Sequence, residues 1–254
     1  MANANLANPF ASCSMKLKRG HSHTEAFARQ FKALDGTDFA AMYVNYNRAS
    51  GDFDLKWGGS QPFIVDLQLT VADSLYNLRS ALDQAACVCA ELGGQAADGT
   101  YFPHGKDAAH FEKNLEKQCR RVPQHFVQIV RECEPYCGGK GYLIRALHEL
   151  NIVDKHRRLI QQDFAMQEVH IDQQIESTPE GLVILPPVHW SSEAAAKDED
   201  TIENSKDGVR FSCSLSFGEV EVLRSRSVRV VMEEMADCVQ QIIEKLGKSA
   251  LSQP

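Results

Sequence analysis

The chain has 254 residues, 43% of them hydrophobic and 24% charged, with a formal net charge of −7. This composition is ordinary for a globular protein. The acidic balance argues against generic electrostatic binding of nucleic acid, which needs lysine and arginine to neutralise phosphates. Residues 120–121 and 155–158 are candidates for local basic patches. No apolar run is long enough to span a membrane, so no membrane partner is expected.

The leader and the cysteines exclude further classes. Residues 1–14 lack the basic start and apolar block of a secretory signal, so we expect a cytoplasmic protein. The eight cysteines form no Cys-x-x-Cys pair. Around Cys119, His125, Cys133 and Cys137 the second tight ligand pair of a zinc site is lacking. We therefore expect buried, reduced thiols, with no metal and no cofactor.

The first third of the chain predicts a helix, a hairpin and a long helix. Apolar residues at helical spacing predict the first helix over 15–34. Residues 40–47 and 51–57 alternate around a turn, which is typical of a β-hairpin. A central helix or helix pair is expected over 63–92, closed by the glycines at 93–94. It carries one apolar face and a second, polar stripe.

The rest of the chain predicts shorter helices, then strands, then a last helix. The expected helices span 108–120, 123–134, 142–162 and 227–246, and the expected strands span 168–174, 181–188 and 209–223, the last broken at Gly218. Residues 190–207 are polar and charged, and we expect a mobile loop there.

Helices in the middle and strands at both ends predict an α+β protein. We expect one domain over 1–254, in which 15–162 form a helical core with an N-terminal hairpin. Residues 163–254 would supply further strands and the C-terminal helix. The strands of both ends would combine into one small, mainly antiparallel sheet.

Two polar motifs lie inside strongly helical, largely apolar segments. Residues 77–84 read Asn-Leu-Arg-Ser-Ala-Leu-Asp-Gln, and residues 151–157 read Asn-Ile-Val-Asp-Lys-His-Arg. Polar groups in such places are costly unless they are paired, so each motif needs a reason. Arg79 and Asp83 stand four residues apart and can pair on one helix face.

These motifs, in this order, resemble a bacterial protein family whose activity is unassigned. Between them lie Phe102–Pro103 and Pro135–Tyr136, which match the family's intervening segments, and the resemblance covers roughly residues 65–160. The first motif is also similar to the signature of the HEPN superfamily of helical bundles. That resemblance implies a HEPN-like bundle core, a stress or defence role, RNA or a nucleotide as partner, and a homodimer.

The superfamily includes metal-independent endoribonucleases, in which an arginine holds the scissile phosphate and a histidine assists proton transfer. By resemblance, Arg79 would be that arginine. Gln84 stands where the histidine is expected, and glutamine cannot act as a general acid or base. Catalysis would then need His148 or His156, on the second polar helix.

Two interpretations are open. In the first, Arg79, His148 and His156 are catalytic, and the ligand is bound by Asn77, Asp83, Gln84, Asn151, Asp154, Lys155 and Arg157. In the second, the same side chains form a satisfied polar network that clamps two helices of a non-catalytic structural or interaction module. For His104, His110, His125 and His170 we expect surface or loop positions.

Overall fold

The computed structural model describes residues 8–35, 37, 40–47, 52–59, 62–178, 181–185, 187–192, 201–206, 208–218, 220–224 and 226–252. The chain is an α+β protein. Its helices are α1 (Ala11–Lys32), α2 (Pro62–Leu92), α3 (Ala108–Gln118), α4 (Gln124–Glu132), α5 (Tyr142–His156), the short 3-10 helix η2 (Glu221–Leu223) and α6 (Val228–Leu251). Its strands are β1 (Ala40–Asn47), β2 (Asp52–Gly59), β3 (Gln162–Ile171), β4 (Gln174–Thr178), β5 (Gly181–Leu185), β6 (Val188–Ser191), β7 (Ile202–Lys206) and β8 (Val209–Phe217).

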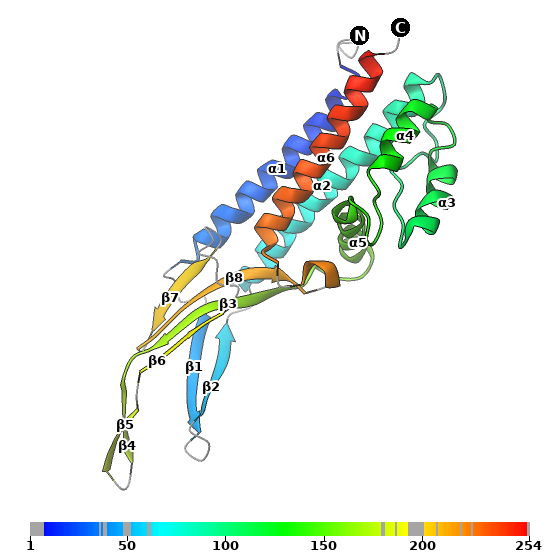
Figure 1. The fold of residues 1–254 in the computed structure, drawn as a ribbon. Helices are drawn as coiled ribbons and strands as arrows, with labels where there is room; N and C mark the ends of the chain where they lie inside the picture. The colour runs from blue at the N-terminus through cyan, green and yellow to red at the C-terminus, as the bar shows by residue number, and fades with distance from the viewer. Residues whose placement is uncertain are drawn as a thin grey trace.

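The helices form a bundle at one end of an elongated molecule, and the strands extend from its other end (Figure 1). The long helices α1, α2 and α6 lie side by side, and α5 packs against α2 and α6. Helix α4 also contacts α6, and α3 contacts α4 on the same side of the bundle. The first and last helices therefore close the bundle together, although they are far apart in the sequence.

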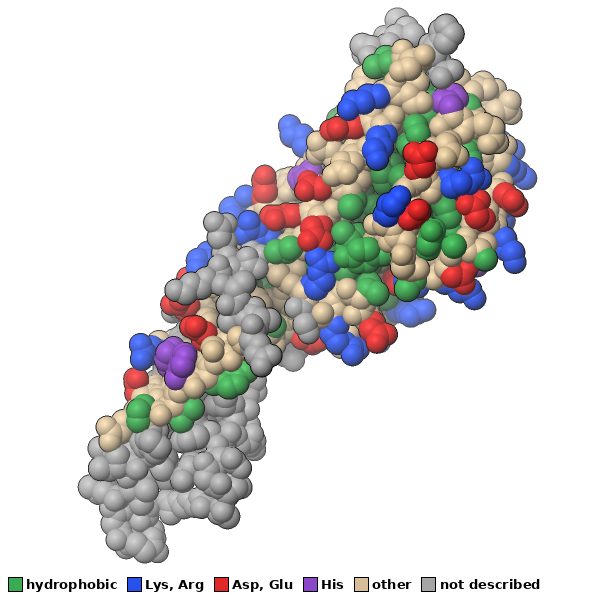
Figure 2. All heavy atoms as spheres, viewed as in Figure 1, with side chains coloured by type: hydrophobic (Ala, Val, Ile, Leu, Met, Phe, Trp, Pro, Cys, Tyr) green, Lys and Arg blue, Asp and Glu red, His purple; other side chains and the backbone are tan. Residues whose placement is uncertain are grey.

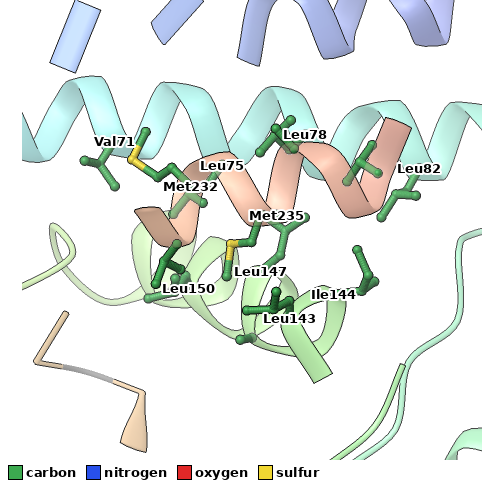
Figure 3. Close-up of a cluster of buried hydrophobic side chains, with 14 of the residues drawn as sticks. Val71, Leu75, Leu78, Leu82, Leu143, Ile144, Leu147, Leu150, Met232 and Met235 are labelled. Carbon is green, nitrogen blue, oxygen red and sulfur yellow. The ribbon is translucent and has the colours of Figure 1, made fainter. Parts of the chain in front are cut away.

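The core of the bundle lies where α2, α5 and α6 meet (Figure 3). Each helix presents apolar side chains three or four residues apart, which is the spacing that puts them on one face. The fully buried members in this region are Val71, Leu75, Leu78, Leu82, Ile144, Leu147, Leu150, Met232 and Met235. Their burial, rather than helix propensity alone, fixes α5 on the bundle.

Local signals end or begin two of the helices next to the site described below. Gly94, with a φ of 71°, follows α2 in the left-handed conformation that glycine adopts without strain. The N–H of Gln95 donates to the carbonyl of Ala90, which satisfies one of the last free carbonyls of that helix. Asp107 caps α3, because its Oδ1 accepts the N–H of His110 at 2.7 Å.

The main sheet has four antiparallel strands in the order β6-β3-β8-β7. Strand β3 pairs with β8 along its whole length, with one irregularity between Met166 and Glu168. Burial alternates in the first half of β8, where Val209 and Phe211 are buried, as expected for a sheet with one covered face. Every residue from Cys213 to Phe217 is buried. Helix α6 contacts β8, which joins the sheet to the bundle.

The helices were predicted more accurately than the sheet. The expected sheet combining the strands of both ends is wrong, since β1 and β2 hydrogen-bond only to each other among the described residues. Helix α6 completes the helical bundle with α1 and α2, so residues 15–162 alone are not the helical core. Of the segment 190–207, β7 is a paired strand with Ile202 fully buried, which contradicts a loop there. Residues 193–200 lie outside the described ranges.

Two expected boundaries also change. Helix α5 ends at His156 rather than near residue 162, and β3 begins at Gln162, earlier than the strand expected from 168. Strand β8 ends at Phe217, just before Gly218, and the residues that follow form η2. These changes place η2 beside α5, which matters for the site.

Acidic and basic side chains are intermixed over the visible face of the bundle, with no large area of one sign (Figure 2). None of the helices in the described part of the chain combines the length and apolarity that crossing a lipid bilayer needs.

Replacing Leu147 by alanine should lower the free energy of unfolding by about 3 kcal/mol, because its side chain is fully buried between α2, α5 and α6. Urea denaturation followed by circular dichroism measures this loss. Leu251→Ala is the matched control, since Leu251 is 83% exposed, and it should change the stability by less than about 0.5 kcal/mol. Equal losses in the two variants would contradict the packing described here.

Candidate functional site

A buried ion pair on α2 holds the loop that follows this helix. Arg79 is only 5% exposed, and its Nη2 donates to Asp83 Oδ1 at 2.6 Å and to the carbonyl oxygen of Phe102 at 2.7 Å. The same Asp83 oxygen accepts the N–H of Phe102 at 3.0 Å. Burial lowers the pKa of Arg79, and the Asp83 carboxylate opposes that shift. The pair therefore satisfies both backbone polar groups of Phe102: Arg79 binds its carbonyl oxygen and Asp83 binds its N–H.

The loop is held at two further points just beyond Phe102. The carbonyl oxygen of His104 accepts from Asn114 Nδ2 at 2.8 Å, and the N–H of Gly105 donates to the carbonyl of Pro135 at 3.0 Å. A Cβ at Gly105 would lie 2.5 Å from the backbone nitrogen of Phe111, so only glycine fits this approach to α3. The segment from Phe102 to Gly105 is thus fixed by contacts with α2, α3 and the backbone at Pro135, and His104 lies within it.

The imidazole ring of His104 stacks on that of His148 from α5. The two ring centroids are 3.5 Å apart, and the planes differ by 28°. Burial, followed by the charges of Arg79, His110 and Arg145, lowers the pKa of His104 to about 4. Burial and then His104 itself, with smaller effects of nearby cations, lower the pKa of His148 to about 3. Both rings are therefore neutral at pH 7.

The stacked histidines form one wall of a cleft of about 620 Å³. The cleft lies between α5, the loop before α3 and the segment around η2. Its lining consists of His104, Lys106, His110, Cys137, Arg145, His148, Glu149, Ile152, Val153, Arg157, Val220, Glu221 and Val222. It thus combines three histidines with both basic and acidic side chains over an apolar floor.

Two of the three cations in the cleft have no acidic partner among the described residues. Arg145 is paired with Glu149, Nη2 to Oε1 at 2.6 Å. Within the described ranges, no ion pair involves the side chains of Lys106 or Arg157. Glu221 is the other acid of the lining. The unpaired positive charge makes the cleft suited to an anion.

Of the predicted site residues, His148 and Arg157 line this cleft. Arg79 and Asp83 lie behind the histidine pair, in the clamp on Phe102. The exposed His156, at the end of α5, is not part of the lining.

The remaining predicted residues face other neighbours. Asn77 is buried toward α1, where its Oδ1 accepts from Lys16 Nζ at 3.3 Å. The ammonium of Lys155 lies 4.6 Å from the centre of the Tyr76 ring, a cation–π contact. Burial and then the neighbouring Asp73 raise the pKa of Asp154.

The two motifs contain polar atoms that packing alone leaves unsatisfied. Arg79 Nη1, Gln84 Oε1, His148 Nδ1 and Asn151 Oδ1 are buried and lack a hydrogen-bond partner among the described residues. Each such atom costs about 1–3 kcal/mol if it stays without a partner. Five further atoms of this kind lie outside the motifs, on Gln118, His125, Gln162 and Gln167, so the feature does not by itself separate a binding site from a structural clamp.

Most residues of the cleft were missed by sequence reasoning, among them His104, Lys106 and Arg145. His104 was expected at a surface or loop position; it does lie in a loop, but its ring is partly buried against His148. Arg145 lies three residues before His148 on α5, which was a usable signal once His148 was a candidate. Within the described ranges, no three His, Cys, Asp or Glu side chains are arranged to hold a metal ion.

Replacing Arg79 by alanine should destabilise the protein by about 3 kcal/mol, because it leaves Asp83 and the Phe102 carbonyl without their partner. Thermal or urea unfolding measures the loss. Arg131→Ala removes a more exposed pair with Glu112 and should cost less than about 1 kcal/mol. A loss for Arg79→Ala no larger than that of the control would show that the clamp does not hold the loop.

Acid should destabilise the protein through the histidine pair. Both folded-state pKa values lie below the ordinary value of 6.5, so below about pH 6.5 the unfolded chain binds more protons than the folded chain. The free energy of unfolding should fall by about 3–4 kcal/mol from this pair between about pH 7 and about pH 5, or about 2 kcal/mol for each ring. Urea denaturation at both pH values measures the change.

The matched variants are His148→Gln, which removes one titrating ring of the pair, and His189→Gln, which removes an exposed histidine on β6. His148→Gln should lose less stability between the two pH values than the wild type, and His189→Gln should lose the same amount. An acid loss unchanged by His148→Gln would contradict the burial of the pair.

Comparison with known proteins leaves the family of this chain open: no family model, curated protein or solved structure matches it. The HEPN resemblance of the first motif stays a prediction.

Proposed function

We propose that the chain binds the phosphate group of a nucleotide, free or within RNA, in the cleft beside the stacked histidines. The observation that carries this proposal is the cleft itself, where Lys106 and Arg157, which form no ion pair with any described residue, lie beside the neutral His104–His148 pair. Arginine and lysine donate charge-assisted hydrogen bonds to phosphate, and a neutral imidazole adds a further donor or acceptor.

The proposal includes a HEPN-like bundle acting in the cytoplasm in a bacterial stress or defence role. The order of the two polar motifs and the packing of their helices, α2 and α5, against each other support it. The homodimer implied by that resemblance is part of the proposal. Catalysis by Arg79 with His148 or His156 would add an endoribonuclease activity to the proposed binding function. Two observations weigh against that form: Arg79 is engaged by Asp83 and Phe102, and Gln84 cannot transfer protons.

A second candidate function is a structural or interaction module without a ligand. The specific observation in its favour is the buried Arg79–Asp83 pair, which satisfies both backbone groups of Phe102 and would be needed in a purely structural role. This candidate gives no reason for unpaired cations in an open cleft. For that reason we favour the binding function.

Binding should be local rather than extensive, because the net charge is −7 and the charges on the face in Figure 2 are intermixed. With about two phosphate contacts from the cleft, the logarithm of the affinity should fall with the logarithm of salt concentration with a slope of roughly −1 to −2. A steeper slope would point to a longer basic track than the cleft provides.

Arg157→Glu should weaken binding of uridine monophosphate and of a short oligouridine by about tenfold or more, because it reverses an unpaired charge in the cleft. Calorimetric titration of the full chain measures both affinities. Oligouridine binding much more tightly than the mononucleotide would indicate RNA, and similar affinities would indicate a free nucleotide.

Lys117→Glu, on the exposed side of α3, is the matched control and should leave both affinities within about twofold. Equal weakening by the two variants would show a non-specific charge effect and remove the cleft as the site. No binding of either ligand by the wild type would refute the binding function and leave the structural module.

A further inference from the structure

The histidine pair occupies a position where a proton and an anion would stabilise each other. The rings of His104 and His148 are stacked with their centroids 3.5 Å apart at the wall of the cleft. His148 Nδ1 is buried and has no hydrogen-bond partner within the described part of the chain. Two imidazolium ions this close would repel each other strongly, so the pair can accept one proton far more readily than two.

The charges around the pair come from every element that surrounds it. The cations are Arg79 behind the rings on α2, Lys106 in the loop, and Arg145, Lys155 and Arg157 on α5. His110, at the start of α3, is a further titratable neighbour in the lining, as is the thiol of Cys137. The acids are Asp83, which is paired with Arg79, Glu149, which is paired with Arg145, and Glu221 on η2.

The five cations outnumber the three acids around the histidine pair, so the surroundings carry a net positive charge even though Arg79 and Arg145 are each paired with an acid. This remaining positive charge and the partly buried environment both disfavour an added proton on either ring while the cleft holds no anion. An anion in the cleft reverses the sign of the nearest charge, and protonation of a ring then becomes favourable.

We infer that an anion entering this cleft is bound together with a proton, which the His104–His148 pair takes up from the solvent. The proton adds to a ring nitrogen, and no covalent bond of the ligand is made or broken. The inference rests on the proposed phosphate-binding function and adds its regulation: occupancy of the cleft rises as the pH falls. Because burial lowers the pKa of both rings, the pair is neutral at pH 7 in the free protein, so a proton present on the pair in the complex must have been taken up on binding.

The probe must not titrate in the range of interest. A phosphate monoester changes charge near pH 6, whereas the phosphodiester of uridylyl-uridine keeps one negative charge and its uracils stay neutral. Calorimetric titration of the full chain with this dinucleotide should give an affinity that rises by about fivefold or more between about pH 7.5 and about pH 5.5. Repeating the titration in two buffers of different ionisation enthalpy counts the protons taken up, and near pH 6 a substantial fraction of one proton is expected.

The variant His148→Gln keeps a hydrogen-bonding side chain that cannot titrate, so the rise in affinity and the proton uptake should both largely vanish. His21→Gln, on α1 outside the cleft, should retain them. If either variant fails to fold, the two-buffer measurement on the wild type decides alone.

The outcomes separate the inference from the function on which it rests. Binding of the dinucleotide without proton uptake, or uptake unchanged in His148→Gln, overturns the inference and leaves the binding function standing. No binding at any pH overturns both. Binding with uptake that His148→Gln abolishes supports both.

Discussion

The arrangement of the candidate site depends on one buried guanidinium. Arg79 is a charge that the bundle encloses almost completely, and it is tolerated because one of its nitrogens reaches both Asp83 and the Phe102 carbonyl. A buried charge without such partners costs several kcal/mol, so the loop cannot leave α2 without exposing or stranding it. The energetic need of a single side chain thus sets the path of the chain after α2.

The path of this loop also determines the position of His104, two residues after Phe102. With Phe102 held by the ion pair and Gly105 held by the Pro135 carbonyl, the short segment between them has little freedom. His104 is consequently presented to α5, where it meets His148. The clamp and the cleft are therefore compatible interpretations of the same motif: Arg79 acts on the structure of the site and on its electrostatic field, while other side chains line the cleft.

Sequence patterns predicted what local periodicity controls. All of the helices except η2 were expected, because apolar residues every three or four positions and glycine or proline at the ends are local signals. The pairing of the strands was not predicted, since separate strand segments contain no local mark of which partner they will choose. Strands β1 and β2 are neighbours in the sequence and form one hairpin. Strands β3 and β8 pair although more than thirty residues separate them in the sequence.

The same distinction applies to the site. His148 and Arg157 were found because they belong to a dense polar motif on one helix. His104 was missed because its position follows from contacts with Asn114 and the clamped Phe102, which are distant in the sequence. A histidine in a loop carries no local signal that its ring will be stacked and partly buried.

The most direct test of this account is a crystal structure of the protein with a bound nucleoside monophosphate. The account predicts that the phosphate lies in the cleft, in contact with Arg157 and the His104–His148 pair, while Arg79 keeps its bonds to Asp83 and the Phe102 carbonyl. A phosphate bound directly to Arg79, with Asp83 or Phe102 displaced, would contradict it and would restore Arg79 as the ligand-binding residue of the first motif.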